Sequence, residues 1–120
     1  MADSASIRSA PSELFGGAYY SVTDSDGFSI AKVLKLEPDK VHVRIYQQHF
    51  ADRPSSIDPS VLTLGTTILD RDNFGISHLP LRLETFMRHK PVFLTYVEVQ
   101  PNELDGYNLW KATAAGSVFE

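Results

Sequence analysis

The chain of 120 residues contains no cysteine, which excludes disulfide bonds, thiolate nucleophiles and cysteine-based zinc sites. It also lacks any apolar run near the ~20 residues that a membrane-spanning helix needs. Its first residues show no basic region followed by an apolar one, as a signal peptide would. We therefore expect a cytoplasmic protein with no membrane partner.

Positive charge is also scarce. Eleven lysines and arginines are dispersed among fifteen aspartates and glutamates, which gives a formal net charge of -4. Nucleic-acid-binding proteins normally carry a basic excess or a basic stripe, so we expect no nucleic-acid partner. The length suits one domain, and we expect a flexible polar leader over residues 1–12, followed by a single globular domain over residues 13–120.

Motifs that carry catalysis or bind cofactors are missing. There is no glycine-rich phosphate loop, and residues 75–79 begin like a nucleophile elbow but have Leu79 in place of the second glycine. The acidic clusters at residues 24–27 and 70–75 do not match a calcium-binding EF-hand loop and are typical of turns. We expect no catalytic residues, no metal and no cofactor.

Residues 26–46 predict a β-hairpin from local signals alone. A proline and an aspartate suit the turn at residues 37–40, and residues 41–47 alternate between apolar and polar side chains. In residues 28–36 the apolar side chains occupy both parities. We expect that strand either to be buried on both faces or to change register at a bulge near residues 30–31.

The rest of the chain predicts more strands and two helices. Strands are expected at residues 18–23, 61–64, 67–69, 92–99 and 116–120. Residues 77–89 have apolar side chains at helical spacing, with Pro80 suited to a helix entry, and a short helix begins at Pro101. The pattern predicts an α+β, mostly β fold: a twisted antiparallel sheet or partial barrel, with one or two short helices packed on it, the main one near residues 81–89.

The returning strand of the hairpin points to a binding surface. Its alternation directs every second side chain away from the core, and the loop that follows is long and rich in proline. Long loops inside compact domains are often functional. We predict a binding surface made of outward side chains of this strand and of the adjoining loop: His42, Arg44, Tyr46, His49, Phe50, Asp52 and Arg53.

An enzymatic alternative remains open at this stage. A small metal-dependent or acid–base hydrolase would use a histidine with a nearby carboxylate, drawn from His42, His49, His78, Asp52 and Glu98. None of the four histidines has the paired spacing of a zinc-binding helix. Among them, His78 is the one that we expect to be partly buried.

Residues 27–46 resemble the opening hairpin of small SH3-like and Tudor-like β-barrels. The resemblance rests on Gly27-Phe28, on the run Ala31-Lys32-Val33-Leu34, on the Pro-Asp turn and on a returning strand that ends at Tyr46. It implies a small barrel whose aromatic side chains bind a peptide or a methylated lysine. The chain is also loosely similar to small bacterial proteins of toxin-immunity type, which implies an acidic surface that binds a basic toxin.

We therefore expect a small non-enzymatic binding domain whose partner is a protein or a peptide. If the domain is of immunity type, its affinity for the partner should fall steeply as salt is added. A homodimer formed through an exposed sheet edge is a third alternative.

Overall fold

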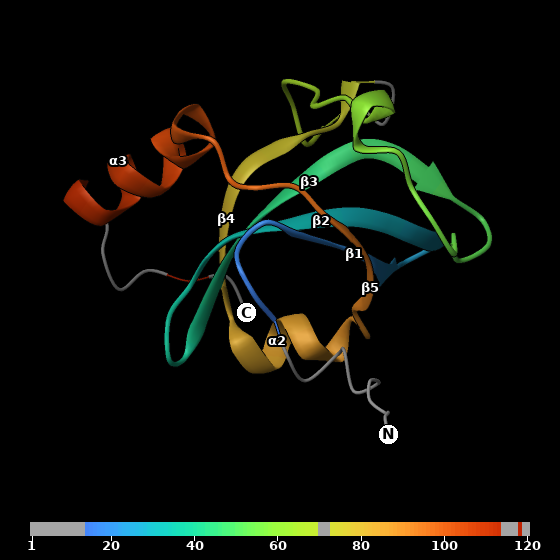
Figure 1. Ribbon diagram of the computed structural model, residues 1–120, viewed down its shortest axis with the longest axis horizontal. Coiled ribbons are helices and arrows are strands. Elements are labelled where there is room, and N and C mark those ends of the chain that lie inside the picture. Colours follow the sequence, from blue (N-terminus) through green and yellow to red (C-terminus); the bar gives the residue numbers. More distant parts are fainter. Residues whose placement is uncertain (1–13, 70–72, 114–117, 119–120) are drawn as a thin grey trace.

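The computed structural model describes residues 14–69, 73–113 and 118. Its centre is an antiparallel sheet of five strands in the order β4-β3-β2-β1-β5, with open edges (Figure 1). The strands are β1 (Ala18–Asp24), β2 (Gly27–Leu36), β3 (Lys40–Phe50), β4 (Ile76–Arg82) and β5 (Val92–Tyr96). The helices are α2 (Leu83–Arg88), α3 (Asp105–Thr113) and the 3₁₀ turns η2 (Pro59–Val61) and η4 (Pro101–Leu104). The prediction of an α+β, mostly β fold is confirmed.

The first hairpin turns at a glycine that no other residue can replace without strain. Gly27 has a φ of 151°, and a Cβ there would lie 2.3 Å from the carbonyl oxygen of Phe50. The backbone of β3 therefore approaches too closely for a side chain. At the second turn, the N–H of Glu37 donates to the carbonyl oxygen of Lys40 over 2.9 Å. The hairpin predicted for residues 26–46 is present as β2 and β3.

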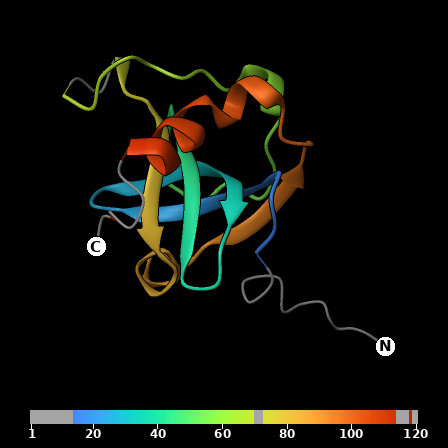
Figure 2. The same ribbon diagram turned by 90° about the vertical axis from the view of Figure 1, so that its left-hand side faces the viewer.

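The curled sheet carries a core on each face. The concave face, toward α2, holds the larger cluster: Ala18, Tyr20, Val22, Ala31, Val33, Val41, Val43, Leu81 and Phe86. The convex face holds a smaller cluster of Tyr19, Ile30 and Tyr46, against which Leu62 and Leu64 pack. The segment η4–α3 lies against this convex face (Figure 2). The sheet is thus the middle of three layers.

Strand β2 is buried on both faces and also changes register, so both explanations of its mixed apolar pattern hold. Its residues from Ser29 to Leu34 are all buried, because side chains of both parities meet a core. Its register against β3 also shifts twice, once between Ser29 and Ala31 and again between Val33 and Lys35. The predicted bulge near residues 30–31 is confirmed together with burial on both faces.

The prediction of one helix over residues 77–89 is wrong in its first half. The chain forms β4 there, and α2 begins only at Leu83. Leu79 and Leu81 both face the core and lie opposite residues of β3. Their spacing of two residues is that of a strand, not of a helix. Pro80 is tolerated because β4 is an edge strand, where one backbone N–H is not needed for pairing.

Other expected elements differ in extent. Strand β5 is shorter than the predicted residues 92–99, and the helix expected after Pro101 is present as η4 followed by α3. In place of the short strands at residues 61–64 and 67–69, the loop holds η2 and an isolated bridge from Thr67 to Phe74. Leu62 and Leu64 pack on the convex face of the sheet without forming a strand of it, whereas Ile68 and Leu69 are exposed.

Two predictions fall on residues that the structure does not describe. The leader over residues 1–12 lies outside the described ranges, and so does the strand expected at residues 116–120, apart from Val118.

Candidate functional site

Three of the predicted binding residues, His42, Arg44 and Tyr46, lie on the convex face of β3. The alternation places them correctly, but η4, α3 and the loop after β3 cover that face. His42 is fully buried, Tyr46 is 7% exposed, and the side chain of Arg44 is 17% exposed. The expectation that they face solvent is therefore wrong. Alternation identifies the face of a strand, but it does not reveal whether a distant segment covers that face.

The other four predicted residues, His49, Phe50, Asp52 and Arg53, do not gather into one surface. Phe50 packs beside the convex cluster, whereas Asp52 is exposed. Arg53 donates from Nη1 to the carbonyl oxygen of Ser21 at 3.0 Å and to its hydroxyl at 2.7 Å, which ties the loop to β1. His49 belongs to a separate polar cluster described below.

Beneath α3, three side chains form a hydrogen-bonded chain. His42 Nε2 lies 2.9 Å from Oε1 of Glu37, and His42 Nδ1 lies 2.9 Å from Nε2 of His78. Tyr107 and Trp110 pack against the His42 ring at steep angles, with ring centroids 4.8 and 4.6 Å away. The Tyr107 hydroxyl donates to the second oxygen of Glu37 over 3.4 Å. Carboxylate, two imidazoles and a phenol thus form one network between sheet and helix.

This network anchors α3 to the sheet. Burial, followed by the charge of His42, lowers the pKa of His78 to about 4, so His78 is neutral at physiological pH. A Cβ at Gly106 would lie 2.6 Å from the Cβ of His78, so the glycine lets the helix approach closely. The two histidines converge, but with Glu37 and under aromatic rings, not with Asp52 or Glu98. The arrangement is that of a packed polar contact.

A buried ion pair lies next to this network on the same face. The Lys32 ammonium, whose residue is 1% exposed, donates to both carboxylate oxygens of Glu103 at 2.9 and 3.1 Å. Burial raises the pKa of Glu103, but hydrogen bonds from Gln100 and Lys32, with the charges of Lys32 and Arg44, hold it below its usual value. Lys32 also lies 5.1 Å from the centroid of the Tyr19 ring. The pair joins η4 to β2.

The open end of the concave face forms an apolar pocket of about 220 Å³. Aliphatic and aromatic side chains line most of it, and polar groups stand at its rim. The lining residues are Val22, Thr23, Asp24, Ser29, Ile45, Phe74, Ile76, Leu79, Leu81, Phe86 and His89. A pocket of this kind suits a small apolar group with a polar end.

Asp24 also belongs to a polar cluster at this rim. His49 Nε2 lies 3.0 Å from an oxygen of Asp24 and 3.0 Å from an oxygen of Asp26, and the Ser29 hydroxyl donates to Asp24. Burial raises the pKa of Asp24, but hydrogen bonds from Ser29 and His49 outweigh it, so that pKa is lowered overall. One donor atom each from Asp24, Asp26 and His49 lies within 4.8 Å of the others. This donor set fits a divalent cation.

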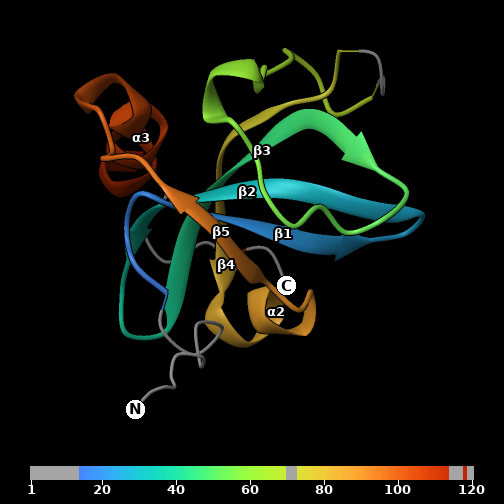
Figure 3. The same ribbon diagram turned by 45° about the vertical axis from the view of Figure 1, so that its right-hand side comes forward.

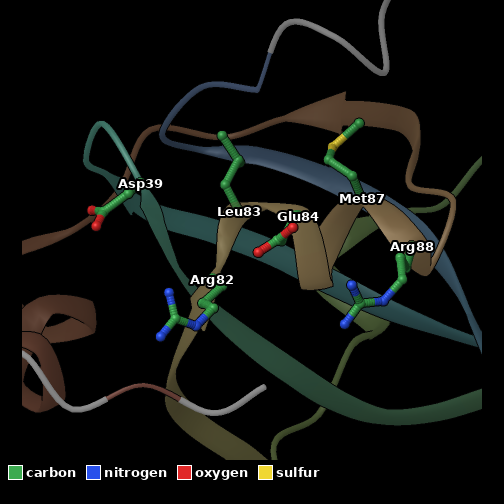
Figure 4. A pocket seen from close by; sticks show the side chains of 6 residues that line it. All are labelled: Asp39, Arg82, Leu83, Glu84, Met87 and Arg88. Atoms are coloured by element: carbon green, nitrogen blue, oxygen red, sulfur yellow. The ribbon is translucent and has the colours of Figure 1, made fainter.

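A second depression, of about 620 Å³, runs along α2. Charged side chains of both signs line it together with Leu83 and Met87 (Figure 4). The charged residues are Asp39, Arg82, Glu84 and Arg88. Glu84 stands between the two arginines in this view, so no single sign of charge dominates the depression. Its lining gives no indication of a particular ligand.

Strand β5 lies at one edge of the sheet (Figure 3). Its apolar side chains are more exposed than those of the other described strands. Within the described residues, β5 pairs only with β1, and no backbone hydrogen bond joins its other edge to another segment. The exposed fraction is 40% for Val92 and 51% for Tyr96, and Phe15, Phe93 and Val97 are also exposed. Residues 91–97 include no charged side chain. Edge strands are normally protected by charge, so this one is unusual.

A bulge in β5 gathers its aromatic side chains. Thr95 pairs with Tyr19 and Phe93 pairs with Tyr20, so Leu94 is an extra residue on the β5 side. In a regular strand, residues three apart point to opposite faces, but this extra residue places Phe93 and Tyr96 on the same face. Both of their rings lie 5.8 Å from the ring of Phe15, centroid to centroid. We call Phe15, Phe93, Tyr96 and the free edge of β5 the edge patch.

Comparison with known proteins gives no indication of function, so the proposal below rests on the geometry described above. No family model, no curated protein and no solved structure matches the chain. The resemblance to SH3-like and Tudor-like barrels therefore stays a prediction. No helix in the described residues is both long enough and apolar enough to cross a membrane.

Proposed function

We propose that this protein is a non-enzymatic interaction domain of the cytoplasm that binds an extended segment of a protein or peptide at the edge patch. The observation that supports the proposal best is an exposed edge strand without charged residues, next to three clustered aromatic rings. An added strand would hydrogen-bond to the free backbone groups of β5. The aromatic rings would select its side chains, since large aromatic surfaces contribute strongly to interfaces.

The buried networks support the same view of the molecule. The chain from Glu37 to His78 and the ion pair of Lys32 with Glu103 hold η4–α3 on the convex face, where a second ligand would otherwise bind. A partner thus has access to the edge patch while the predicted surface around His42 stays covered. Neither a nucleic acid nor a membrane is the proposed partner, because a net charge of -4 disfavours both anionic surfaces.

Backbone amide NMR shifts on addition of extended peptides test this proposal. A mixture of synthetic nine-residue peptides with alternating apolar side chains should shift the signals of β5 and Phe15 and leave those of α3 unchanged. Tyr96→Lys should abolish the shifts, because it places a charge in the patch. Leu109→Lys is the matched control, since Leu109 is 65% exposed but lies on α3. Shifts that spread over α3, or none at any peptide concentration in a chain that sediments as a monomer, would refute strand addition.

A second candidate function is metal-dependent hydrolysis at the pocket rim. It is favoured by the donor atoms of Asp24, Asp26 and His49, which lie beside the 220 Å³ pocket. Three protein ligands would leave coordination positions for water, which a bound cation activates. Calorimetric titration with Zn²⁺ or Mn²⁺ checks this. Stoichiometric binding that His49→Gln abolishes and His89→Gln preserves would support it, and an absence of binding heat would eliminate it.

A further inference from the structure

The two ends of β5 carry opposite charge. Arg88 and Lys90 precede the strand and Glu98 follows it, whereas residues 91–97 between them are uncharged. Lys90 and Glu98 are both exposed, and neither has an ion-pair partner among the described residues. The segment is therefore a short uncharged strand with an unpaired cation at one end and an unpaired anion at the other.

An antiparallel copy of the same strand would complement this pattern. In a twofold pair centred on Leu94 and Thr95, the basic end of each strand lies beside the acidic end of the other. The pairing also brings Phe93 of one copy opposite Tyr96 of the second copy, on the same face and at two symmetric places. Cross-strand aromatic pairs and opposite charges both stabilise sheets. A parallel arrangement would instead place like charges together at each end.

We propose that the occupant of the edge patch is a second copy of this chain, paired antiparallel through β5 about a twofold axis. This inference rests on the proposed function, since it names the partner of the same edge. The two sheets then join into one sheet of double width. Such a pairing is isologous and closes on itself, so it ends at a dimer rather than a fibre. It also removes from solvent an edge that residues 91–97 do not protect with charge.

Charge reversal at the two ends provides the test. Sedimentation equilibrium of the wild-type chain should show a monomer–dimer equilibrium. Lys90→Glu places two acidic pairs at the interface and Glu98→Lys places two basic pairs, so each should weaken the dimer about tenfold or more. Mixing the two variants should restore the dimer, because both ends of the heterodimer then pair opposite charges. Lys111→Glu, on the exposed side of α3, is the matched control and should leave the equilibrium unchanged.

The outcomes separate this inference from the proposed function. A wild-type chain that stays monomeric at all concentrations, or a dimer that none of these reversals affects, would overturn the second-copy proposal. If that monomer still binds nine-residue peptides at β5, the proposed function stands with a foreign partner. If it binds none, both fail. Circular dichroism spectra of each variant would verify that the fold is retained.

Discussion

His42 and His78 share a hydrogen bond of 2.9 Å between Nδ1 of the first and Nε2 of the second, and their rings lie within 10° of parallel. The two residues are 36 positions apart and come from adjacent strands, β3 and β4. Only one of these two nitrogens can hold the shared proton. When His42 carries a proton on each ring nitrogen, it donates to both Glu37 and His78, and His78 must then be neutral.

Stability should therefore fall as pH drops from about 6.5 to about 4. The pKa of His78 is about 4 in the folded chain against 6.5 in the unfolded chain, so the unfolded chain binds the proton first. The stabilising contribution is complete above 6.5 and is lost as pH falls through that window. Urea denaturation at stepped pH measures it.

A substitution separates His78 from the other groups that titrate. His78→Gln keeps a hydrogen-bonding side chain and should flatten the pH dependence between 6.5 and 4, although it lowers stability at pH 7. The loss of stability that begins near pH 4.5 should remain in this variant, because it comes from Glu37. The hydrogen bond to His42 lowers the pKa of Glu37 in the folded chain, so the unfolded chain takes up that proton first. His89→Gln serves as the control, because the ring of His89 bonds to the carbonyl oxygen of Thr23 and lies outside this network. An unchanged slope in His78→Gln would contradict the assignment.

Removing one partner of the buried ion pair should cost more than removing both. Lys32→Met leaves the carboxylate of Glu103 in a largely buried position without its main cation, which should lower the free energy of unfolding by about 3 kcal/mol. The double variant Lys32→Met with Glu103→Gln should recover part of that loss. Chemical denaturation of the single and double variants checks it, and additive losses would show that the two residues do not interact.

Replacing the glycine of the first turn should destabilise the sheet. Gly27→Ala introduces a Cβ 2.3 Å from the carbonyl oxygen of Phe50 and forces a positive φ on alanine, which should cost about 1–3 kcal/mol. Gly16→Ala is the control, because its Cβ would meet only the carbonyl oxygen of Leu34 at 3.6 Å. Thermal unfolding of both variants is the measurement, and equal melting temperatures would show that the turn relaxes freely.

The sequence predicts those features of the fold that are written in adjacent residues. The Asp-Gly turn, the Pro-Asp turn and the alternation of residues 41–47 are local, and the hairpin they predict is present. Residues 77–82 fit two patterns, because Leu79, Leu81 and Leu83 alternate as in a strand, whereas Leu79, Leu83, Phe86 and Met87 have the spacing of one helix face. These residues form a strand because they pair with β3, which lies far from them in the sequence and is therefore not visible in the local pattern.

The candidate sites depend still more on distant contacts. In the sequence Asp52 is the carboxylate nearest to His49, but the ring bonds to Asp24 and Asp26 at the turn between β1 and β2. The cover over His42 comes from residues beyond position 100, which no pattern in β3 reveals. The edge patch did leave a sequence signal: seven successive residues without charge between Lys90 and Glu98. Only the strand order shows that this run lies at an edge.

The late position of η4 and α3 in the chain affects how the molecule is made. During synthesis, β1 to β4 leave the ribosome before Glu103, Tyr107 and Trp110 do. Until then the ammonium of Lys32 lacks its carboxylate partner and the imidazole of His42 lacks its aromatic cover. The nascent sheet therefore exposes Lys32 and His42 on its convex face, and this polar part of the face stays hydrated until η4 and α3 cover it.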